Sequence, residues 1–175
     1  MLRLLLLRHA KAERSRPGEK DHERLLAERG RGDAPKLGAY MVRHGFVPDH
    51  VVVSTSTRTR ETWELAARAF ERLPPVHFDG RVYEASPQAI LNVIKETGSQ
   101  IGTLLVVGHN PGLQELATQL VAVGDADALR RLKEEFPTSA LAVISFMVED
   151  WSRLHARAGR LEHFVTSKQL AAATD

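Results

Sequence analysis

Short apolar runs alternate along this chain with longer segments in which apolar residues recur every three or four positions. Apolar runs closed by polar residues are typical of strands buried in a parallel sheet. Four such runs occur, at Arg3–Leu7, His50–Val53, Val76–Tyr83 and Leu104–Val107. Because helical spacing appears between them, the pattern predicts a mostly parallel sheet covered by helices on both faces.

Four amphipathic helices are predicted from apolar residues that share a helical face. These faces are formed by Leu37, Tyr40, Met41 and His44; by Trp63, Ala66, Ala67 and Phe70; by Ile90, Val93 and Ile94; and by Leu113, Leu116 and Leu120. The last two helices follow Ser86-Pro87 and Asn110-Pro111, each of which places a capping residue before a proline at the first helical position. We interpret all four faces as parts of the core.

The remaining segments complete the predicted organisation. Ala140–Met147 and Leu161–Val165 are predicted to be two further strands that extend the sheet. Glu13–Asp33 is rich in charge, Gly and Pro, so we expect a long loop over the functional site. Ser167–Asp175 is expected to be a loosely held tail. A length of 175 residues and 43% hydrophobic composition fit a single domain that spans residues 1–175.

Composition excludes several classes of function. The 24 basic and 22 acidic side chains are interspersed and leave a net charge of only +2, so nucleic acid is not an expected partner. The absence of cysteine excludes a disulfide framework, a thiolate nucleophile and a cysteine-ligated zinc site. The N-terminal apolar run is too short for a signal peptide, and no stretch reaches the roughly 20 apolar residues of a membrane span. We therefore expect a cytoplasmic protein without membrane contact.

Two of the predicted strands end in a histidine, at Arg8-His9 and Gly108-His109. Ligands of open α/β sheets bind beyond the carboxyl ends of the strands, so both histidines are expected at one site. A neutral histidine can attack phosphorus, and the forked guanidinium groups of Arg8 and of Arg58, which follows the second strand, match phosphate oxygens. His109 could add a further donor when it is protonated.

Two more residues are candidates at this edge of the sheet. Glu84 follows the third predicted strand and is a candidate acid for the leaving group, although it could instead cap the next helix or pair with an arginine. The helix that begins near Pro111 offers backbone N–H groups and the positive end of its dipole. We include Asn110, which precedes it, among the predicted phosphate-binding residues.

These segments together resemble the histidine phosphatase superfamily, also called phosphoglycerate mutase-like, in its SixA-type phosphohistidine phosphatase variant. Arg8-His9-Ala10-Lys11-Ala12-Glu13 is similar to the Arg-His-Gly signature of that family, with Ala10 in place of the usual glycine. Further similar segments are Leu25–Arg31, Ser54–Thr62, Val107–Gly112, Phe136–Ala140 and Phe164–Thr166. The resemblance therefore covers nearly the whole chain.

The resemblance implies a three-layer α/β sandwich with a phosphoglycerate mutase-like sheet and no large lid insertion. It implies that His9 is phosphorylated covalently and that Arg8, Arg58 and His109 form the phosphate pocket, without a cofactor or a metal. An open site suits phosphohistidine on a signalling protein. The methyl group of Ala10 is expected to narrow the pocket, because glycine allows the closest backbone approach.

Other functions remain open on the residues alone. A phosphatase or mutase acting on a small phosphomonoester would use the same groups, and a non-catalytic phosphate-binding or phosphoprotein-binding module would need Arg8 and Arg58 but no nucleophile. A zinc site at His9 and His109 is disfavoured, because zinc usually takes three or four ligands and the arginines would repel a cation.

Overall fold

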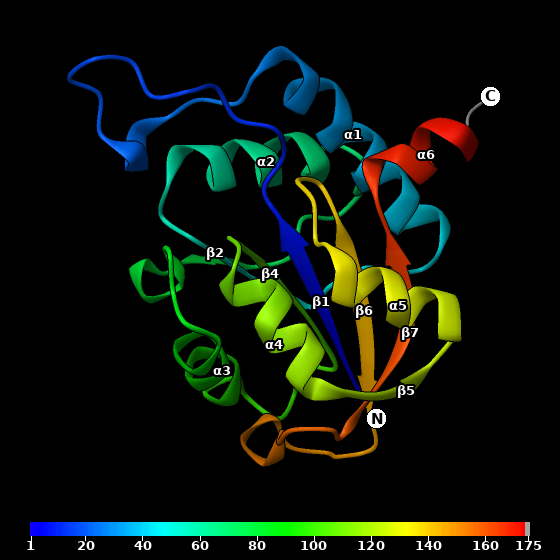
Figure 1. The fold of residues 1–175 in the computed structure, drawn as a ribbon. Coiled ribbons are helices and arrows are strands. Elements are labelled where there is room, and N and C mark those ends of the chain that lie inside the picture. The colour runs from blue at the N-terminus through cyan, green and yellow to red at the C-terminus, as the bar shows by residue number, and fades with distance from the viewer. Residues whose placement is uncertain (174–175) are drawn as a thin grey trace.

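The computed structural model describes residues 1–173, which form a seven-stranded sheet between two layers of helices (Figure 1). The order of the strands is β3-β2-β4-β1-β6-β7-β5. β6 runs antiparallel to β1 and β7, and the other neighbouring strands are parallel. The strands are β1 (Leu2–Arg8), β2 (His50–Val53), β3 (Val76–Phe78), β4 (Thr103–Gly108), β5 (Val121–Gly124), β6 (Leu141–Phe146) and β7 (Gly159–Val165). The predicted α/β sandwich is confirmed.

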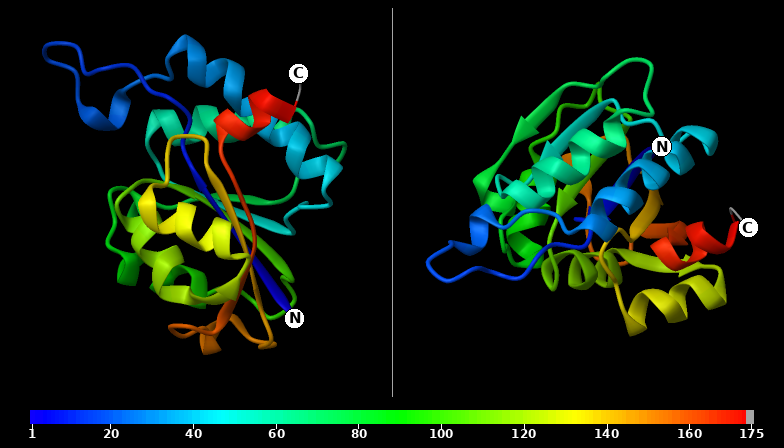
Figure 2. Two further views of the ribbon diagram at one scale, coloured as in Figure 1. Left: turned by 45° about the vertical axis from the view of Figure 1, so that its right-hand side comes forward. Right: turned by 90° about the horizontal axis from the view of Figure 1, so that it is seen from above.

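β1 lies at the centre of the sheet, and its leucines alternate between the two faces. Leu4 and Leu6 pack under α3 (Pro87–Lys95), α4 (Gly112–Leu120) and α5 (Ala126–Glu134). Leu5 and Leu7 pack under α1 (Glu28–Arg43), α2 (Thr57–Ala67) and α6 (Ser167–Ala173), and Figure 2 shows the two layers. Because all four leucines are fully buried, the end of β1 has a fixed position. No helix within residues 1–173 is long and apolar enough to cross a membrane.

The predicted third strand is too long. β3 ends at Phe78, and residues 80–82 form a 3₁₀ turn, η2 (Gly80–Val82). The side chain of Asp79 accepts a hydrogen bond from the backbone N–H of Arg81 (2.9 Å), which turns the chain out of the sheet. Glu84 therefore follows a turn and not a strand.

Two elements had not been predicted, β5 and α5. β5 is an edge strand of four residues that pairs only with β7, so a single side chain, Val121, is buried in it. α5 buries Ala128 and Leu132, packs Leu129 against the core and carries charged residues on its other side, and its N-terminus is capped by the carboxylate of Asp125. The apolar pattern of β5 was too weak to indicate a strand, whereas the short amphipathic pattern of α5 was missed.

The long loop ends six residues earlier than predicted, because α1 begins at Glu28. Gly30 and Gly32, which suggested a loop, lie inside the helix. A Cβ on Gly30 would stand 2.2 Å from the carbonyl oxygen of Lys11, so the glycine lets α1 pack directly on the chain that leaves β1. The actual loop, residues 9–27, contains the 3₁₀ turn η1 (Asp21–Glu23) and extends from the arrowhead of β1 (Figure 1).

The prediction of a loose tail is wrong for residues 167–173, which form α6. Leu170 is buried against Leu37 and Met41 of α1, and Gln169 accepts a hydrogen bond from the backbone N–H of Thr166 (3.0 Å). The buried Leu170 and the hydrogen bond to Thr166 help to hold this helix. A single buried leucine does not form an apolar pattern that predicts a helix from the sequence. Residues 174–175 of the predicted tail lie outside the described residues.

Exchange of Gly30 for alanine should destabilise the protein by about 1–3 kcal/mol, because the new methyl group would overlap the backbone of Lys11. Gly32→Ala is the matched control in the same helix. Its Cβ would meet nothing within 4 Å, so it should stabilise the protein by about 1 kcal/mol through helix propensity. Chemical denaturation of both variants measures the two changes, and equal effects would contradict the tight contact.

Candidate functional site

His9 is the first residue after β1, and it is almost fully buried. Its Nδ1 lies 2.8 Å from the carbonyl oxygen of Ala10, which can only accept a hydrogen bond. Nδ1 therefore carries the proton of the neutral ring, and Nε2 keeps its lone pair. Burial, followed by the charges of Arg58 and Arg8, lowers the pKa of His9 to about 3 against the opposing effect of the Ala10 hydrogen bond. The ring is thus uncharged at neutral pH, as a nucleophile requires.

Arg58 lies in the first turn of α2, whose N-terminus is capped by Ser56, and its side chain is buried. The guanidinium group donates through one terminal nitrogen to the carbonyl oxygen of Asp21 (2.8 Å) and through the other to Asp21 Oδ2 (3.0 Å). The second nitrogen also lies 3.4 Å from Nδ1 of His109. The Nε of Arg58 is buried without a hydrogen-bond partner and remains a donor for a ligand.

His109 follows β4, and its ring centre lies 5.3 Å from that of His9. Because Nδ1 accepts from Arg58, Nε2 carries the proton and donates to Ser54 Oγ (2.8 Å). Burial first, and then the nearby His9 and Arg58, lower the pKa of His109 to about 3. The predicted role as a protonated donor therefore requires a bound anion that raises this pKa.

The spacing of Ser54, Arg58 and Thr62 has a structural explanation. Thr62, one turn beyond Arg58 on α2, accepts a hydrogen bond from the backbone N–H of Ala10 (2.9 Å) and donates to the carbonyl oxygen of Arg58 (2.7 Å). Ser54 contacts His109. Ser54, just before α2, and Thr62, within α2, therefore connect this helix to His109 after β4 and to Ala10 after β1.

Ala10 does not act as predicted. Its side chain is buried in a small apolar cluster with Leu26, Ala34 and Leu65. The methyl group thus packs beneath the loop and α1, and the expectation that it narrows the pocket is wrong.

Arg8 and Asn110 meet at the carbonyl oxygen of Phe136, to which their side chains donate at 3.1 and 2.8 Å. The amide oxygen of Asn110 also accepts from the backbone N–H of Gln114 (3.3 Å). α4 begins at Gly112 with Pro111 as its N-cap, so Asn110, which was predicted to be the capping residue, lies one residue before the observed N-cap. Both ends of the Asn110 amide brace the backbone, and its phosphate-binding role stays a prediction.

Glu84 lies at the rim of the cluster. Its Oε1 is 3.9 Å from a terminal nitrogen of Arg58, and its side chain is 58% exposed. The backbone of Glu84 is in the left-handed region (φ 46°), which is uncommon for a residue with a side chain and directs the chain from η2 into α3. Glu84 can therefore be reached from solvent while it remains close to the arginine.

Sequence reasoning missed three residues of this cluster. The carboxylate of Asp21 in η1 accepts a hydrogen bond from the hydroxyl of Tyr83 as well as from Arg58. The ring of Tyr83 packs edge-on against His109, with centres 5.3 Å apart. Arg24 has a buried Nε without a hydrogen-bond partner, 3.4 Å from Asp21 Oδ1. Asp21 and Arg24 lie in a loop full of charges, where no periodic pattern distinguishes them.

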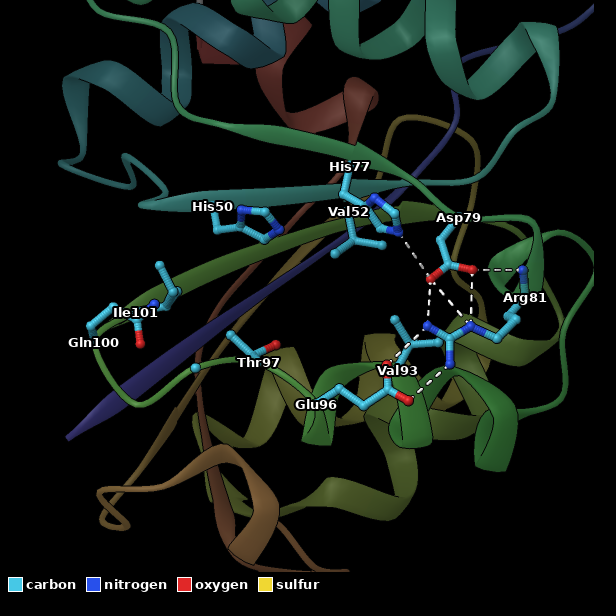
Figure 3. Close-up of a pocket in the computed structure, with 11 residues that line it drawn as sticks. His50, Val52, His77, Asp79, Arg81, Val93, Glu96, Thr97, Gln100 and Ile101 are labelled. Carbon is cyan, nitrogen blue, oxygen red and sulfur yellow. Dashed lines mark hydrogen bonds and ion pairs between the residues drawn. The ribbon is translucent and has the colours of Figure 1, made fainter.

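Several hollows lie outside the histidine pair. Figure 3 shows one of about 250 Å³, where Arg81 donates to both Asp79 and Glu96, so that its charged groups are already paired. A second hollow of about 430 Å³ adjoins Arg8. It is lined by Arg8, Lys11, Arg29, Asn110, Gln114, Glu134, Glu135, Phe136, Pro137 and Thr138. This second hollow continues the histidine site along the surface.

No three side chains of His, Asp or Glu within residues 1–173 are grouped so that they could hold a metal ion. The two histidines of the cluster are bordered by the buried guanidinium group of Arg58, which opposes the approach of a cation. The same positive charge favours an anion.

Comparison with known proteins identifies the family. The model of the histidine phosphatase superfamily (branch 1) matches residues 4–88. A structure described as a candidate phosphohistidine phosphatase SixA from Agrobacterium tumefaciens is 30% identical, with a TM-score of 0.79 over 94% of this chain and 97% of that chain. This chain belongs to the histidine phosphatase superfamily. The predicted resemblance to its SixA-type members is confirmed.

Other proteins are similar to this chain over nearly its whole length. A SixA-type structure from Nakamurella multipartitia is 26% identical, with a TM-score of 0.82 over 94% of this chain and 95% of that chain. An uncharacterised protein of Mycobacterium leprae is 33% identical over 162 residues, which are 90% of this chain and 98% of the relative. The superfamily and these structures together support a phosphatase.

Acidification should destabilise the protein through the two site histidines. The pKa of each is near 6.5 in the unfolded chain and about 3 in the folded one, so between these values the unfolded chain binds more protons. The free energy of unfolding should therefore fall as the pH decreases from 6.5 towards 3, by up to about 1.4 kcal/mol per pH unit for each histidine. Denaturation at several pH values measures the slope.

His9→Gln should reduce this slope by up to about 1.4 kcal/mol per pH unit, because the histidine with the lowered pKa is removed. An unchanged slope in the His9 variant would show that His9 titrates normally in the folded protein.

Proposed function

We propose that this chain is a phosphatase that forms a phosphorylated His9 intermediate, requires no metal, and acts on phosphohistidine carried by a protein. The observation that supports this most is the state of His9. Its ring is buried and uncharged, its tautomer is set by the Ala10 carbonyl, its Nε2 keeps a lone pair, and the charges of Arg58 and Arg8 act on it. Such a group can attack phosphorus at neutral pH.

The proposed reaction has two displacements at phosphorus. The lone pair of His9 Nε2 forms a bond to phosphorus while the P–N bond of the substrate breaks, and the electron pair stays on the departing imidazole nitrogen. Water then attacks the phosphorylated His9, loses a proton to solvent, and releases inorganic phosphate with the electron pair returning to Nε2. No oxidant or reductant is needed.

The cations of the site have the role of binding the phosphoryl oxygens. Arg58 is buried and Arg8 is partly buried, so their charges are less screened by water than those of surface arginines. Approach of the phosphoryl anion would raise the pKa of His109, whose ring could then take a proton and donate from Nδ1. These donors thereby stabilise the negative charge that develops on the phosphoryl oxygens during the reaction.

Glu84 is proposed to assist the leaving group. Its exposed carboxyl group lies at the rim, 3.9 Å from Arg58, whereas the carboxylate of Asp21 is occupied by Tyr83 and Arg58. It can accept a hydrogen bond from the protonated ring nitrogen of a departing imidazole.

The hollow beside Arg8 supports a protein substrate. Its lining includes Lys11, Arg29, Glu134 and Glu135, so it carries charges of both signs. A peptide segment next to a phosphorylated histidine offers matching side chains of both signs, which a small phosphomonoester lacks.

Mutation of His9 tests the proposed reaction. The wild-type protein should release phosphate from a phosphohistidine peptide in the presence of a chelator, and His9→Ala should abolish this release. His155→Ala is the matched control and should retain full activity, because that histidine is exposed and contacts only the backbone of Arg153. Retained turnover in the His9 variant would remove His9 as the nucleophile.

The same assay separates the other functions. Faster release from a small phosphomonoester than from the peptide would indicate a small-molecule phosphatase, and loss of activity with chelator would indicate a metal. Phosphate binding without turnover of any substrate would indicate a binding module.

Arg58→Ala should weaken binding of vanadate, a phosphate analogue, by about 1.5–3 kcal/mol, because a buried charged donor is lost. Arg60→Ala is the control on the same helix, since that arginine is exposed and stacks on Phe78. Calorimetric titration measures both, and equal affinities would contradict the proposed role of Arg58.

A further inference from the structure

The loop residue Asp21 makes more polar contacts with the cluster than any predicted carboxylate does. Its backbone carbonyl oxygen and its Oδ2 receive the two terminal nitrogens of Arg58, at 2.8 and 3.0 Å. Oδ2 also accepts from the hydroxyl of Tyr83, and Oδ1 lies 3.4 Å from Nε of Arg24. A single residue of η1 thus joins two arginines and a tyrosine.

We propose that Asp21 is a positioning residue, which orients the guanidinium group of Arg58 for the phosphoryl group. This inference rests on the proposed function. Asp21 would not touch the substrate and would act through Arg58.

The hydrogen bonds of Arg58 indicate that Asp21 orients its guanidinium group and does not block it from a ligand. Each terminal nitrogen has two hydrogens, and Asp21 takes one from each. The other hydrogen on the second nitrogen is directed to His109, which lies on the side of the histidine pair. Asp21 and His109 therefore hold the outer part of the guanidinium group, and Nε, which has no hydrogen-bond partner, keeps a hydrogen for an anion.

Asp21 also offsets the positive charge of the site. Arg58, Arg8 and Arg24 all lie close enough to His9 to lower its pKa, so they repel one another as well. Burial disfavours the charged form of Asp21, but the hydrogen bonds from Tyr83 and Arg58 outweigh it and lower the pKa of Asp21 to about 2. The carboxylate is therefore ionised at neutral pH and keeps the arginines together.

The loop that carries Asp21 is fastened to the structure on both sides of η1. Glu61 on α2 accepts from the backbone N–H of Leu26 (2.9 Å), and Ala12 pairs with Leu26 in an isolated bridge. His22 contacts Thr55 Oγ1 (2.8 Å). Asp21 is thus presented to Arg58 by an anchored segment, as positioning requires.

Vanadate titration and turnover of a phosphohistidine peptide test the role of Asp21. Asp21→Ala should weaken vanadate binding and lower kcat/KM by roughly tenfold to a hundredfold, as expected when a charged hydrogen bond that orients a donor is lost. Asp21→Asn, which keeps an oxygen acceptor, should have a smaller effect. Glu23→Gln removes the same charge from the same turn without a contact to Arg58, and it should change neither value by more than about twofold.

A double-mutant cycle shows whether Asp21 acts through Arg58. In an Arg58→Ala background, Asp21→Ala should cause no further loss of vanadate affinity, because the group it orients is absent. Unfolding of each variant is followed in parallel, and the Asp21 variants should lose some stability, because the charge opposing the arginines is removed, but should remain folded at the assay temperature.

The outcomes separate this inference from the proposed function. If wild-type protein binds vanadate and Asp21→Ala binds it equally or more tightly, Asp21 obstructs Arg58 or is neutral, and only the present inference is wrong. Additive losses in the double mutant would also overturn it. If wild-type protein neither binds vanadate nor becomes phosphorylated on His9, the proposed function fails and takes the inference with it.

Discussion

The structure around the site depends on one constraint, which is that an uncharged histidine must be held close to three arginines, one of which, Arg58, is buried. Arg8, Arg24 and Arg58 lower the pKa of His9 together with burial, and their mutual repulsion would open the cluster if nothing opposed it. Asp21 supplies the opposing charge, and backbone carbonyl oxygens receive other donors of the arginines, as Phe136 does for Arg8. The positive charge of these donors favours the binding of an anion beside them.

The sheet makes this arrangement rigid. β1 and β4 are neighbours in the centre of the sheet, and their carboxyl ends place His9 and His109 side by side. α2 is joined to both strands by Ser54 and Thr62, so Arg58 cannot move without breaking hydrogen bonds in the core. The burial of the leucines of β1 and their neighbours therefore offsets the repulsion between the like charges of the site.

The charges at the exposed rim of the site differ from those around the two histidines. Around the histidines the donors are the guanidinium groups of arginines, which suit a phosphoryl group. At the rim stand Glu84 and the mixed walls of the hollow beside Arg8, which are open to water. This contrast favours a substrate whose leaving group is basic and attached to a larger polar surface, as a phosphorylated histidine on a protein is.

The sequence by itself determined most of the sheet and the family, because a buried strand needs a continuous apolar run. It also predicted that Arg8, His9, Arg58 and His109 share one edge of the sheet, because they follow the ends of such runs. It failed where few apolar side chains are buried, as in β5, α5 and α6, and where a close backbone contact uses a glycine, as at Gly30. Only the tertiary structure decided that Asn110 braces Phe136, that Ala10 packs away from the pocket, and that Asp21 joins the arginines. These contacts link segments far apart in the chain, and the direction of a loop side chain follows from its partners, which no local pattern records.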